Sequence, residues 1–389
     1  MLNYFKNIKD SFKLKHYLNY IIIGVAFLLV LVLNSIGALN RSTLSLLTQI
    51  GYSVILAVSL NLVVGFLGEL SLGHAGFMCI GAYLGTLIGN FVYAAVPSIT
   101  FSLVVSMVVG GIVAAIFGFV VGMPALRLRG DYLAIVTLAF GEIVRNICRN
   151  IPILGGALGL SSDIYSAVSQ AKYPLFIPTF IALILMLVVI QNLIRSKHGR
   201  AITAVRDNEI AAKSMGVNVT FYKLFVFIVS AFFAGVAGAL YGAFASPVNY
   251  GTFDYNYSIE ILVMVVLGGM GSINGSIIAA TLITLINNYL KAFLTGDMAG
   301  VKTLVYALIL IVMVIYKNAP ALKSIRERFT LKNILGMIFK KKEPTADKQT
   351  DDDARWDVVT TKIEMNEVLS TDLVIEESVT SPDKEGGES

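Results

Sequence analysis

Long apolar segments separated by short polar ones run through most of the chain. A hydrocarbon core about 30 Å thick needs roughly 20 apolar residues in a helix. The pattern therefore predicts membrane spans at about 19–36, 44–64, 76–96, 99–122, 132–148, 176–195, 221–245, 258–272, 276–292 and 301–316. Glycines interrupt 258–292, which predicts either two short spans or one span with a re-entrant turn buried within protein. The fold class expected is all-α, a polytopic transmembrane helical bundle of about ten spans.

Lysine and arginine clusters predict the orientation of these spans. One cluster precedes the first span, one follows the sixth and one follows the last. Such clusters stay in the cytoplasm, and an even number of spans separates them, so we expect both termini to be cytoplasmic. Arg145 and Arg149 do not fit, because they fall near the outer end of the fifth span. They indicate a water-filled cavity there or a misplaced boundary.

Composition and charge add the parts outside the bundle. The chain is 56% hydrophobic and 14% charged, and residues 343–389 carry 14 acidic and 4 basic residues. We expect an acidic, disordered cytoplasmic tail there, while the basic remainder suits anionic lipid rather than nucleic acid. No small-x-small cleavage site follows the first apolar run, so we expect that span to be uncleaved. The predicted parts are a basic N-terminus (1–18), a permease domain (19–316) with a cytoplasmic loop (196–220), a basic juxtamembrane segment (317–342) and the tail (343–389).

The motifs of common enzyme classes are missing. There is no phosphate-binding G-x-x-x-x-G-K-[ST] loop, no H-E-x-x-H, no G-x-S-x-G and no C-x-x-C. Cys79 and Cys148 lie in apolar segments, and the chain has only 3 histidines. We therefore expect no catalytic residues, no metal and no cofactor. Uphill transport would have to draw its energy from a partner or from an ion gradient.

Polar side chains in or beside the spans are the candidates for a pathway or a gate. Ionisable groups are expensive in lipid and normally face protein or water. Glu142 and Arg145 are three residues apart on a helix, so they form either a structural ion pair or part of the pathway lining. A hydrogen-bonded structural position at a span end is expected for His74. The candidates are Glu69, Ser71, His74, Thr137, Glu142 and Arg145.

Three spans carry small residues at every fourth position, which keeps them on one helix face. Small side chains let helix backbones approach closely in lipid, so these stripes predict packing within the bundle. They are Gly81, Gly85 and Gly89; Ala114, Gly118 and Gly122; and Ser230, Ala234, Gly238 and Gly242.

The polar segment between the sixth and seventh predicted spans, 196–219, is too long for a bare turn. Its residues favour one short helix from Ala201 to Met215, with Gly216 as the stop. The helix is partly amphipathic. It suits either docking to a cytosolic partner or a position in the lipid headgroup plane.

Three stretches resemble the permease subunits of ABC importers for branched-chain amino acids, the LivH/LivM type. They are GFLGELSLGHAGFMCIGAY at 65–83, PALRLRGDYLAIVTLAFGEIVR at 124–145, and the segment 199–242. The second and third point to the LivM-like rather than the LivH-like subunit. The resemblance implies a pair of permease subunits, two cytosolic ATP-binding subunits, an extracytoplasmic substrate-binding protein, and alternating access in the cell (inner) membrane.

The resemblance also places contacts with the ATPase on the 196–220 loop. The importer pattern has contiguous Glu-Ala-Ala, but here Ile210 separates Glu209 from Ala211, whereas the step from Ala212 to Gly216 is kept. The implied coupling residues are Arg200, Arg206, Asp207, Glu209, Ala211, Ala212 and Gly216.

Two other functions remain open from the sequence. One is an ABC permease for urea or short amides. The other is an ion-coupled secondary transporter, for which Glu142 or Glu260 would be the coupling carboxylate.

Overall fold

The computed structural model describes residues 40–126, 128 and 130–293, with isolated positions at 24, 30–32, 34, 36, 308 and 311. The predictions for 1–18, 317–342 and 343–389 lie outside the described residues, and those for 19–36 and 301–316 lie almost wholly outside them. The longer helices are α3 (Arg41–Asn61), α4 (His74–Ala95), α5 (Ile99–Ala125), α6 (Asp131–Asn150), α8 (Phe176–Arg195), α11 (Val219–Phe244), α12 (Tyr255–Gly268) and α13 (Ile273–Phe293). The shorter ones are η1 (Leu62–Leu67), η2 (Pro152–Leu154), η3 (Gly156–Leu158), α7 (Asp163–Gln170), α9 (Lys197–Asp207), α10 (Glu209–Ser214) and η4 (Tyr250–Phe253).

The eight predicted spans from 44–64 to 276–292 each coincide with one helix, and the all-α class is confirmed. Within the described part of the chain, the only β-type pairing is an isolated bridge between Leu160 and Val248. Five of the described helices are long and apolar enough to cross a membrane. These are α3 with its continuation η1, α4, α5, α8 and α11.

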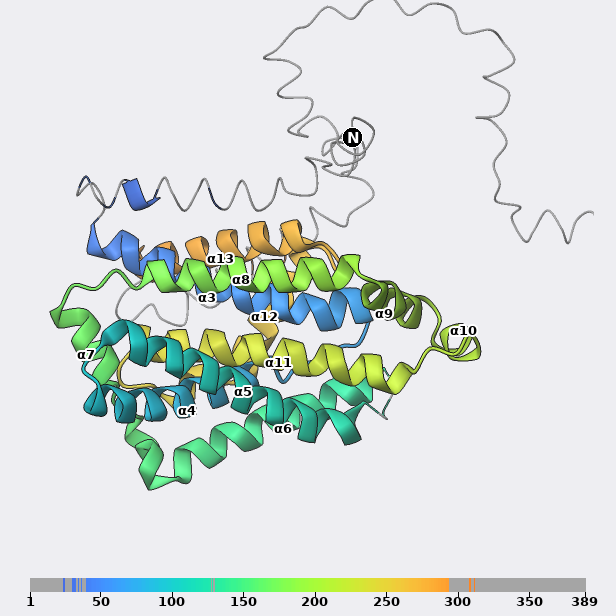
Figure 1. Ribbon diagram of the computed structural model, residues 1–389, viewed down its shortest axis with the longest axis horizontal. Helices are drawn as coiled ribbons and strands as arrows, with labels where there is room; N and C mark the ends of the chain where they lie inside the picture. The colour runs from blue at the N-terminus through green and yellow to red at the C-terminus, as the bar shows by residue number, and fades with distance from the viewer. Residues whose placement is uncertain are drawn as a thin grey trace, which may run out of the picture. The chain divides into compact units, whose positions relative to one another are not determined.

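Helix α3 is the central element of the bundle. Every residue from Gly51 to Asn61 is buried, and α8, α11, α12 and α13 pack around it (Figure 1). A helix that is apolar on all sides needs such a surround of other helices.

Helices α4, α5 and α11 pack through the small-residue stripes, as predicted. A methyl group at Gly81 would overlap the Gly235 carbonyl oxygen, and one at Gly118 would press on the Ala231 methyl. The hydroxyl of Ser106 donates to the Gly85 carbonyl at 2.6 Å. The other face of α5 is apolar and exposed, which suits contact with lipid; it includes Phe101, Val104, Val108, Ile112 and Ile116.

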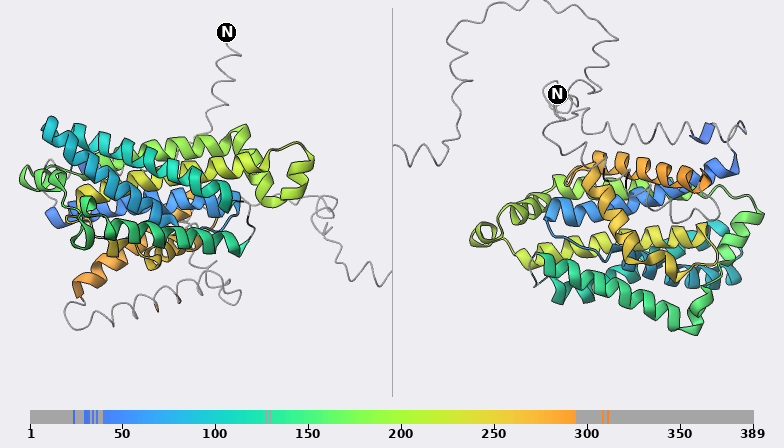
Figure 2. Two further views of the ribbon diagram at one scale, coloured as in Figure 1. Left: turned by 90° about the horizontal axis from the view of Figure 1, so that it is seen from below. Right: turned by 180° about the vertical axis from the view of Figure 1, so that it is seen from behind.

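The short helices lie at the two ends of this bundle. Helices α9 and α10 project from one end, and α7 lies at the other (Figures 1 and 2). We refer to these as the α9–α10 end and the α7 end.

The glycine-interrupted region 258–292 forms two helices, α12 and α13, joined by a tight turn. Gly269 and Gly271 in this turn have φ angles of 100° and 78°, which favour glycine. A methyl group at Gly275 would overlap the Gly268 carbonyl group, so the two helices meet closely beside the turn. With 14 residues, α12 is shorter than the roughly 20 residues that span a bilayer.

Candidate functional site

Helix α3 does not end as an ordinary helix. It continues as the six-residue π-helix η1, and Gly68, with a φ of 82°, ends that helix. Residues 68–73 then run without helical structure to the start of α4 at His74. π-Helical turns are rare and are frequent at functional sites. The gap between the predicted spans 44–64 and 76–96 agrees with this break, but nothing in the apolar run Leu62–Leu67 signals a π-helix. We call η1 and residues 68–73 the interruption.

The buried side chain of Asn61 ties the interruption to the α12–α13 turn. Its Nδ2 donates to the Ser272 carbonyl oxygen at 3.1 Å and to Ser276 Oγ at 2.9 Å, and its Oδ1 accepts from the Gly271 N–H at 2.9 Å. A methyl group at Gly65 would overlap Asn61 Oδ1 and the Gly271 nitrogen. Three elements therefore meet at one fully buried amide, which the sequence analysis missed.

The non-helical segment 68–73 is held against α6. The Leu72 N–H donates to Thr137 Oγ1 at 3.0 Å, and a methyl group at Gly73 would overlap the Thr137 carbonyl. Ser71 is buried within the segment. The hydrogen bond expected for His74 is present, since its Nε2 lies 2.9 Å from Ser59 Oγ on α3.

A buried lysine on α11 joins this segment to the short helices. Lys223 Nζ lies 2.5 Å from Glu69 Oε1 and 3.1 Å from Glu209 Oε2. Its side chain is only 6% exposed, against 13% for Glu69 and 37% for Glu209. We call these three residues the carboxylate–lysine cluster. The sequence analysis missed Lys223, although a single lysine inside an apolar helix is a signal of a functional or paired position.

The segment between α8 and α11 forms two helices, so the prediction of one helix from Ala201 to Met215 is wrong. Asn208 is extended, and its side chain caps α10 by accepting from the Ala211 N–H at 3.0 Å. This cap breaks the helix, since an asparagine at this position satisfies the donors of a new one. The predicted stop at Gly216 is confirmed by its φ of 83°.

The predicted coupling residues divide into two groups. Arg206, Glu209 and Ala212 face the bundle: Arg206 Nη1 donates to the Gly65 carbonyl at 3.2 Å, and Ala212 is buried. The others are exposed on α9, on α10 or just after it; they are Arg200, Asp207, Ala211 and Gly216.

Two large apolar side chains accompany the exposed group. Ile210 is 78% exposed and Met215 is 83% exposed. Asp207 Oδ1 accepts from Arg206 Nη2 at 2.8 Å. An apolar surface therefore lies on α10 beside charged residues, which the sequence analysis described only as partial amphipathicity.

The C-terminal half of α6 carries an ion pair, which the spacing of Glu142 and Arg145 allowed. Glu142 Oε2 lies 3.2 Å from Arg145 Nε, with both side chains about one-quarter exposed. The Arg149 guanidinium carbon lies 5.4 Å from the centroid of the Tyr250 ring. The misfit of these arginines with a lipid-facing position is thus explained by a carboxylate and an aromatic partner.

Among the described residues, no group of three or more histidines, cysteines, aspartates and glutamates lies close enough together to hold a metal ion. Cys79 and Cys148 are buried free thiols whose sulfur atoms lie 3.8 Å apart.

The chain is similar to known permeases over most of its length. The family described as "Branched-chain amino acid transport system / permease component" matches residues 42–316. The high-affinity branched-chain amino acid transport system permease protein LivM of Salmonella typhimurium is 34% identical over 76% of this chain and 73% of its own length. LivM of Escherichia coli is 35% identical over the same shares. No solved structure matches the chain.

A more distant relative is of the other permease type. The probable LivH protein of Methanocaldococcus jannaschii is 32% identical over 37% of this chain and 52% of its own length. The matches to the LivM proteins of Salmonella typhimurium and Escherichia coli are longer and more similar than this one, in agreement with the LivM-like resemblance of the sequence. The apolar helices and these matches together describe a multi-pass membrane protein. The chain belongs to the family of branched-chain amino acid transport permeases, on its LivM-like side.

Proposed function

We propose that the chain is one of two permease subunits of an ABC importer that takes up leucine, isoleucine and valine across the cytoplasmic membrane. Its α9–α10 end faces the cytoplasm, where two ATP-binding subunits dock and hydrolyse ATP. Its α7 end faces the extracytoplasmic substrate-binding protein. The family and the names of the LivM relatives support the substrate class. The second subunit is LivH-like.

The observation that carries this proposal is the link between α9–α10 and the interruption of α3. Arg206 on α9 donates to the Gly65 carbonyl oxygen, in the π-helical part of that interruption. Glu209 on α10 shares Lys223 with Glu69 in the non-helical segment. A displacement of the two short helices is therefore passed to the segment 68–73 by one hydrogen bond and one buried charge cluster.

The interruption is a suitable element for a gate. Residues 69–73 lie between two helices, and the segment is held by Thr137 on α6, which accepts from the Leu72 N–H, and by Lys223 on α11, which pairs with Glu69. A small movement can exchange such contacts for others without unfolding a helix. ATP drives transport because the nucleotide-bound assembly prefers one conformation of this element over the other.

The ATP-binding subunits dock on the apolar surface of α10. Ile210 and Met215 provide the buried centre of that contact, and the exposed Arg200 and Asp207 lie beside it. Such anchors carry most of the binding energy of a protein interface when a polar rim surrounds them.

Uptake of radiolabelled leucine by the complete transporter in vesicles tests the proposal. We expect uptake only with ATP on the cytoplasmic side and with the binding protein present. Uptake driven by an ion gradient alone would refute it in favour of a secondary transporter. Uptake of urea but not of leucine would refute the substrate class and leave the ATP-driven mechanism standing.

A further inference from the structure

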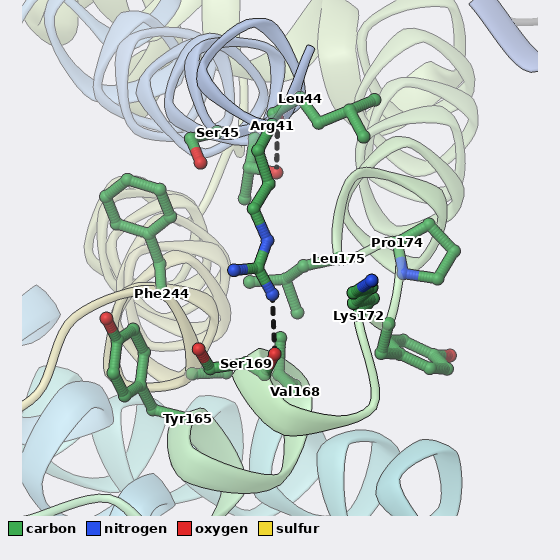
Figure 3. Close-up of a pocket in the computed structure, with 13 residues that line it drawn as sticks. Arg41, Leu44, Ser45, Tyr165, Val168, Ser169, Lys172, Pro174, Leu175 and Phe244 are labelled. Carbon is green, nitrogen blue, oxygen red and sulfur yellow. Dashed lines mark hydrogen bonds between the residues drawn. The ribbon is translucent and has the colours of Figure 1, made fainter. Parts of the chain in front are cut away.

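A cavity of about 630 Å³ opens at the α7 end of the bundle. The start of α3, helix α7 with the turn after it, and the last turn of α11 enclose it (Figure 3). No sequence motif and no candidate residue of the sequence analysis pointed to this place. Its size exceeds the volume of one amino acid, so it can hold one together with water.

Among the described residues, two cations line this cavity and no carboxylate does. Arg41 Nη2 donates to the Ser169 carbonyl oxygen at 2.5 Å, which anchors one of the five N–H donors of its guanidinium. Figure 3 shows the Arg41 side chain crossing the cavity from α3 towards α7. Lys172 lines the same cavity with a φ of 51°, an uncommon backbone conformation for a residue other than glycine. Neither side chain forms an ion pair within the part of the chain that the structure describes.

The rest of the lining has an apolar part and a polar part. The apolar part is formed by Leu44, Val168, Pro174, Leu175, Ala243 and Phe244, and the polar part by the hydroxyl-bearing side chains of Ser45, Thr48, Tyr165, Ser169 and Tyr173. An inorganic anion would use only the cations and the hydroxyl groups. A small molecule with a carboxylate at one end and a branched hydrocarbon at the other would use both parts of the cavity.

A second cavity of about 350 Å³ lies beyond Phe244, which lines both. It reaches between α3, α11, α12 and α13, and Tyr52, Tyr241 and Tyr257 give it a polar lining. Its described lining includes the carboxylate of Glu260, whose Oε1 accepts from Asn287 Nδ2 at 2.8 Å. Cationic side chains thus lie on one side of Phe244 and a carboxylate on the other, an arrangement that suits a molecule carrying both charges.

We propose that the outer cavity binds the carboxylate of an aliphatic amino acid through Arg41 and Lys172 as it enters, with Phe244 separating this entry site from the inner cavity. The inference rests on the proposed function, because it assigns a binding step to the same substrate class. Binding at this site is weak, since a tight entry site would slow passage through the transporter.

Thiol labelling tests the site directly. Cys79 and Cys148 are buried, so a cysteine introduced by Ser45→Cys reports on the cavity. The complete transporter carrying it is placed in right-side-out vesicles and labelled from outside with a membrane-impermeant maleimide. At about 10 mM ligand and a Kd of about 5 mM, bound ligand slows labelling roughly threefold. We expect this slowing with leucine and with its keto acid, which keeps the carboxylate and lacks the ammonium group.

Two ligands and three variants decide the outcome. Leucinamide, which lacks the carboxylate, and acetate, which lacks the hydrocarbon, should leave the labelling rate unchanged. Adding Arg41→Gln or Lys172→Gln should abolish the protection of the reporter cysteine by leucine. Arg149 is a cation over Tyr250 that does not line the cavity, so Arg149→Gln should leave this protection unchanged. Equal protection by leucinamide or by acetate would overturn the inference. A reporter on the opposite wall, Val168→Cys, replaces Ser45→Cys if that variant fails to assemble.

The same vesicles separate this inference from the proposed function. ATP-driven leucine uptake without any protection of the reporter would overturn the entry site alone. Absence of ATP-driven uptake by the unmodified transporter would count against the proposed function. Protection by the binding protein without leucine would show a docking surface for that protein and would also overturn the inference.

Discussion

Two groups of charged side chains, one at each end of the bundle, are arranged in opposite ways. At the α9–α10 end, one buried lysine has two carboxylates within 3.1 Å. At the α7 end, Arg41 and Lys172 line a cavity to whose wall the described residues contribute no carboxylate. Both groups of cations lie close to the membrane-spanning helices, but within the described part of the chain only Lys223 is paired with carboxylates.

The difference is between charges that hold two elements of the chain together and charges that can bind a ligand. Opposite charges that are buried together fix the relative position of the elements that carry them, because separating them leaves a charge without compensation. Lys223 can therefore transmit movement between α10 and the segment 68–73. Arg41 and Lys172 have no ion-pair partner among the described residues, so they can bind a carboxylate that arrives from outside.

Removing the cation of the paired end should have the largest effect. Lys223→Met leaves Glu69 and Glu209 beside each other, and loss of one partner of a buried charge pair costs about 3 kcal/mol or more. We expect leucine uptake to fall at least about tenfold while the ATP-binding subunits continue to hydrolyse ATP. Uptake and ATP hydrolysis measured in the same vesicles give the ratio that defines coupling.

A charge-matched variant separates loss of the cluster from loss of the fold. Adding Glu69→Gln and Glu209→Gln to Lys223→Met removes all three charges, and replacing a buried charge cluster by neutral groups is often tolerated. We expect the triple variant to recover membrane levels but not coupling. Wild-type coupling in the triple variant would mean that the cluster transmits nothing.

Much of the fold was predictable because lipid imposes a simple rule. A chain that crosses a bilayer must use long apolar helices, so the eight helices that coincide with predicted spans could be placed from hydropathy alone. The stripe of Gly81 and Gly85 predicted close packing for the same kind of reason, since only small residues admit a neighbouring backbone. Gly216 marked a helix end correctly because its backbone conformation excludes most other residues.

The site was less predictable because its contacts join residues far apart in the chain. Asn61 contacts the turn at Gly271, and Glu69 contacts Lys223, and nothing in the local sequence encodes these distances. The break between α9 and α10 depended on Asn208, which is compatible with a helix interior by propensity but is preferred as a cap. Cavities between helices are likewise invisible to a pattern read along one chain.

The docking surface of α10 should give the next largest effect. Ile210→Asp places a charge at the centre of an apolar contact, which should weaken binding of the ATP-binding subunits about tenfold. Binding is measured by co-purification and by titration of the ATP-binding subunits onto vesicles. Leu158→Asp, an equally exposed apolar position of the described chain near the α7 end, is the matched control. Equal loss of binding in both variants would exclude α10 as the docking element.

The pair on α6 should give a smaller effect and decides between its two interpretations. Glu142 and Arg145 are partly exposed, and such pairs contribute about 0.2–1 kcal/mol. If the pair is only structural, Glu142→Gln should change leucine uptake by less than about twofold. The exchange variant, Glu142→Arg with Arg145→Glu, should then transport normally. A several-fold loss in the exchange variant, at normal membrane levels, would instead place these side chains on the pathway.

The smallest effect on the fold is expected where charges have no counter-charge to lose. Arg41→Gln together with Lys172→Gln removes no ion pair of the described chain and leaves apolar packing unchanged. The thermal midpoint of the purified transporter should therefore move by no more than about 2 °C, far less than for Lys223→Met. Gln keeps an amide donor for the Ser169 carbonyl, so even that hydrogen bond has a replacement. A destabilisation as large as that of Lys223→Met would mean that these cations hold the α7 end together, and the contrast between the two ends would disappear.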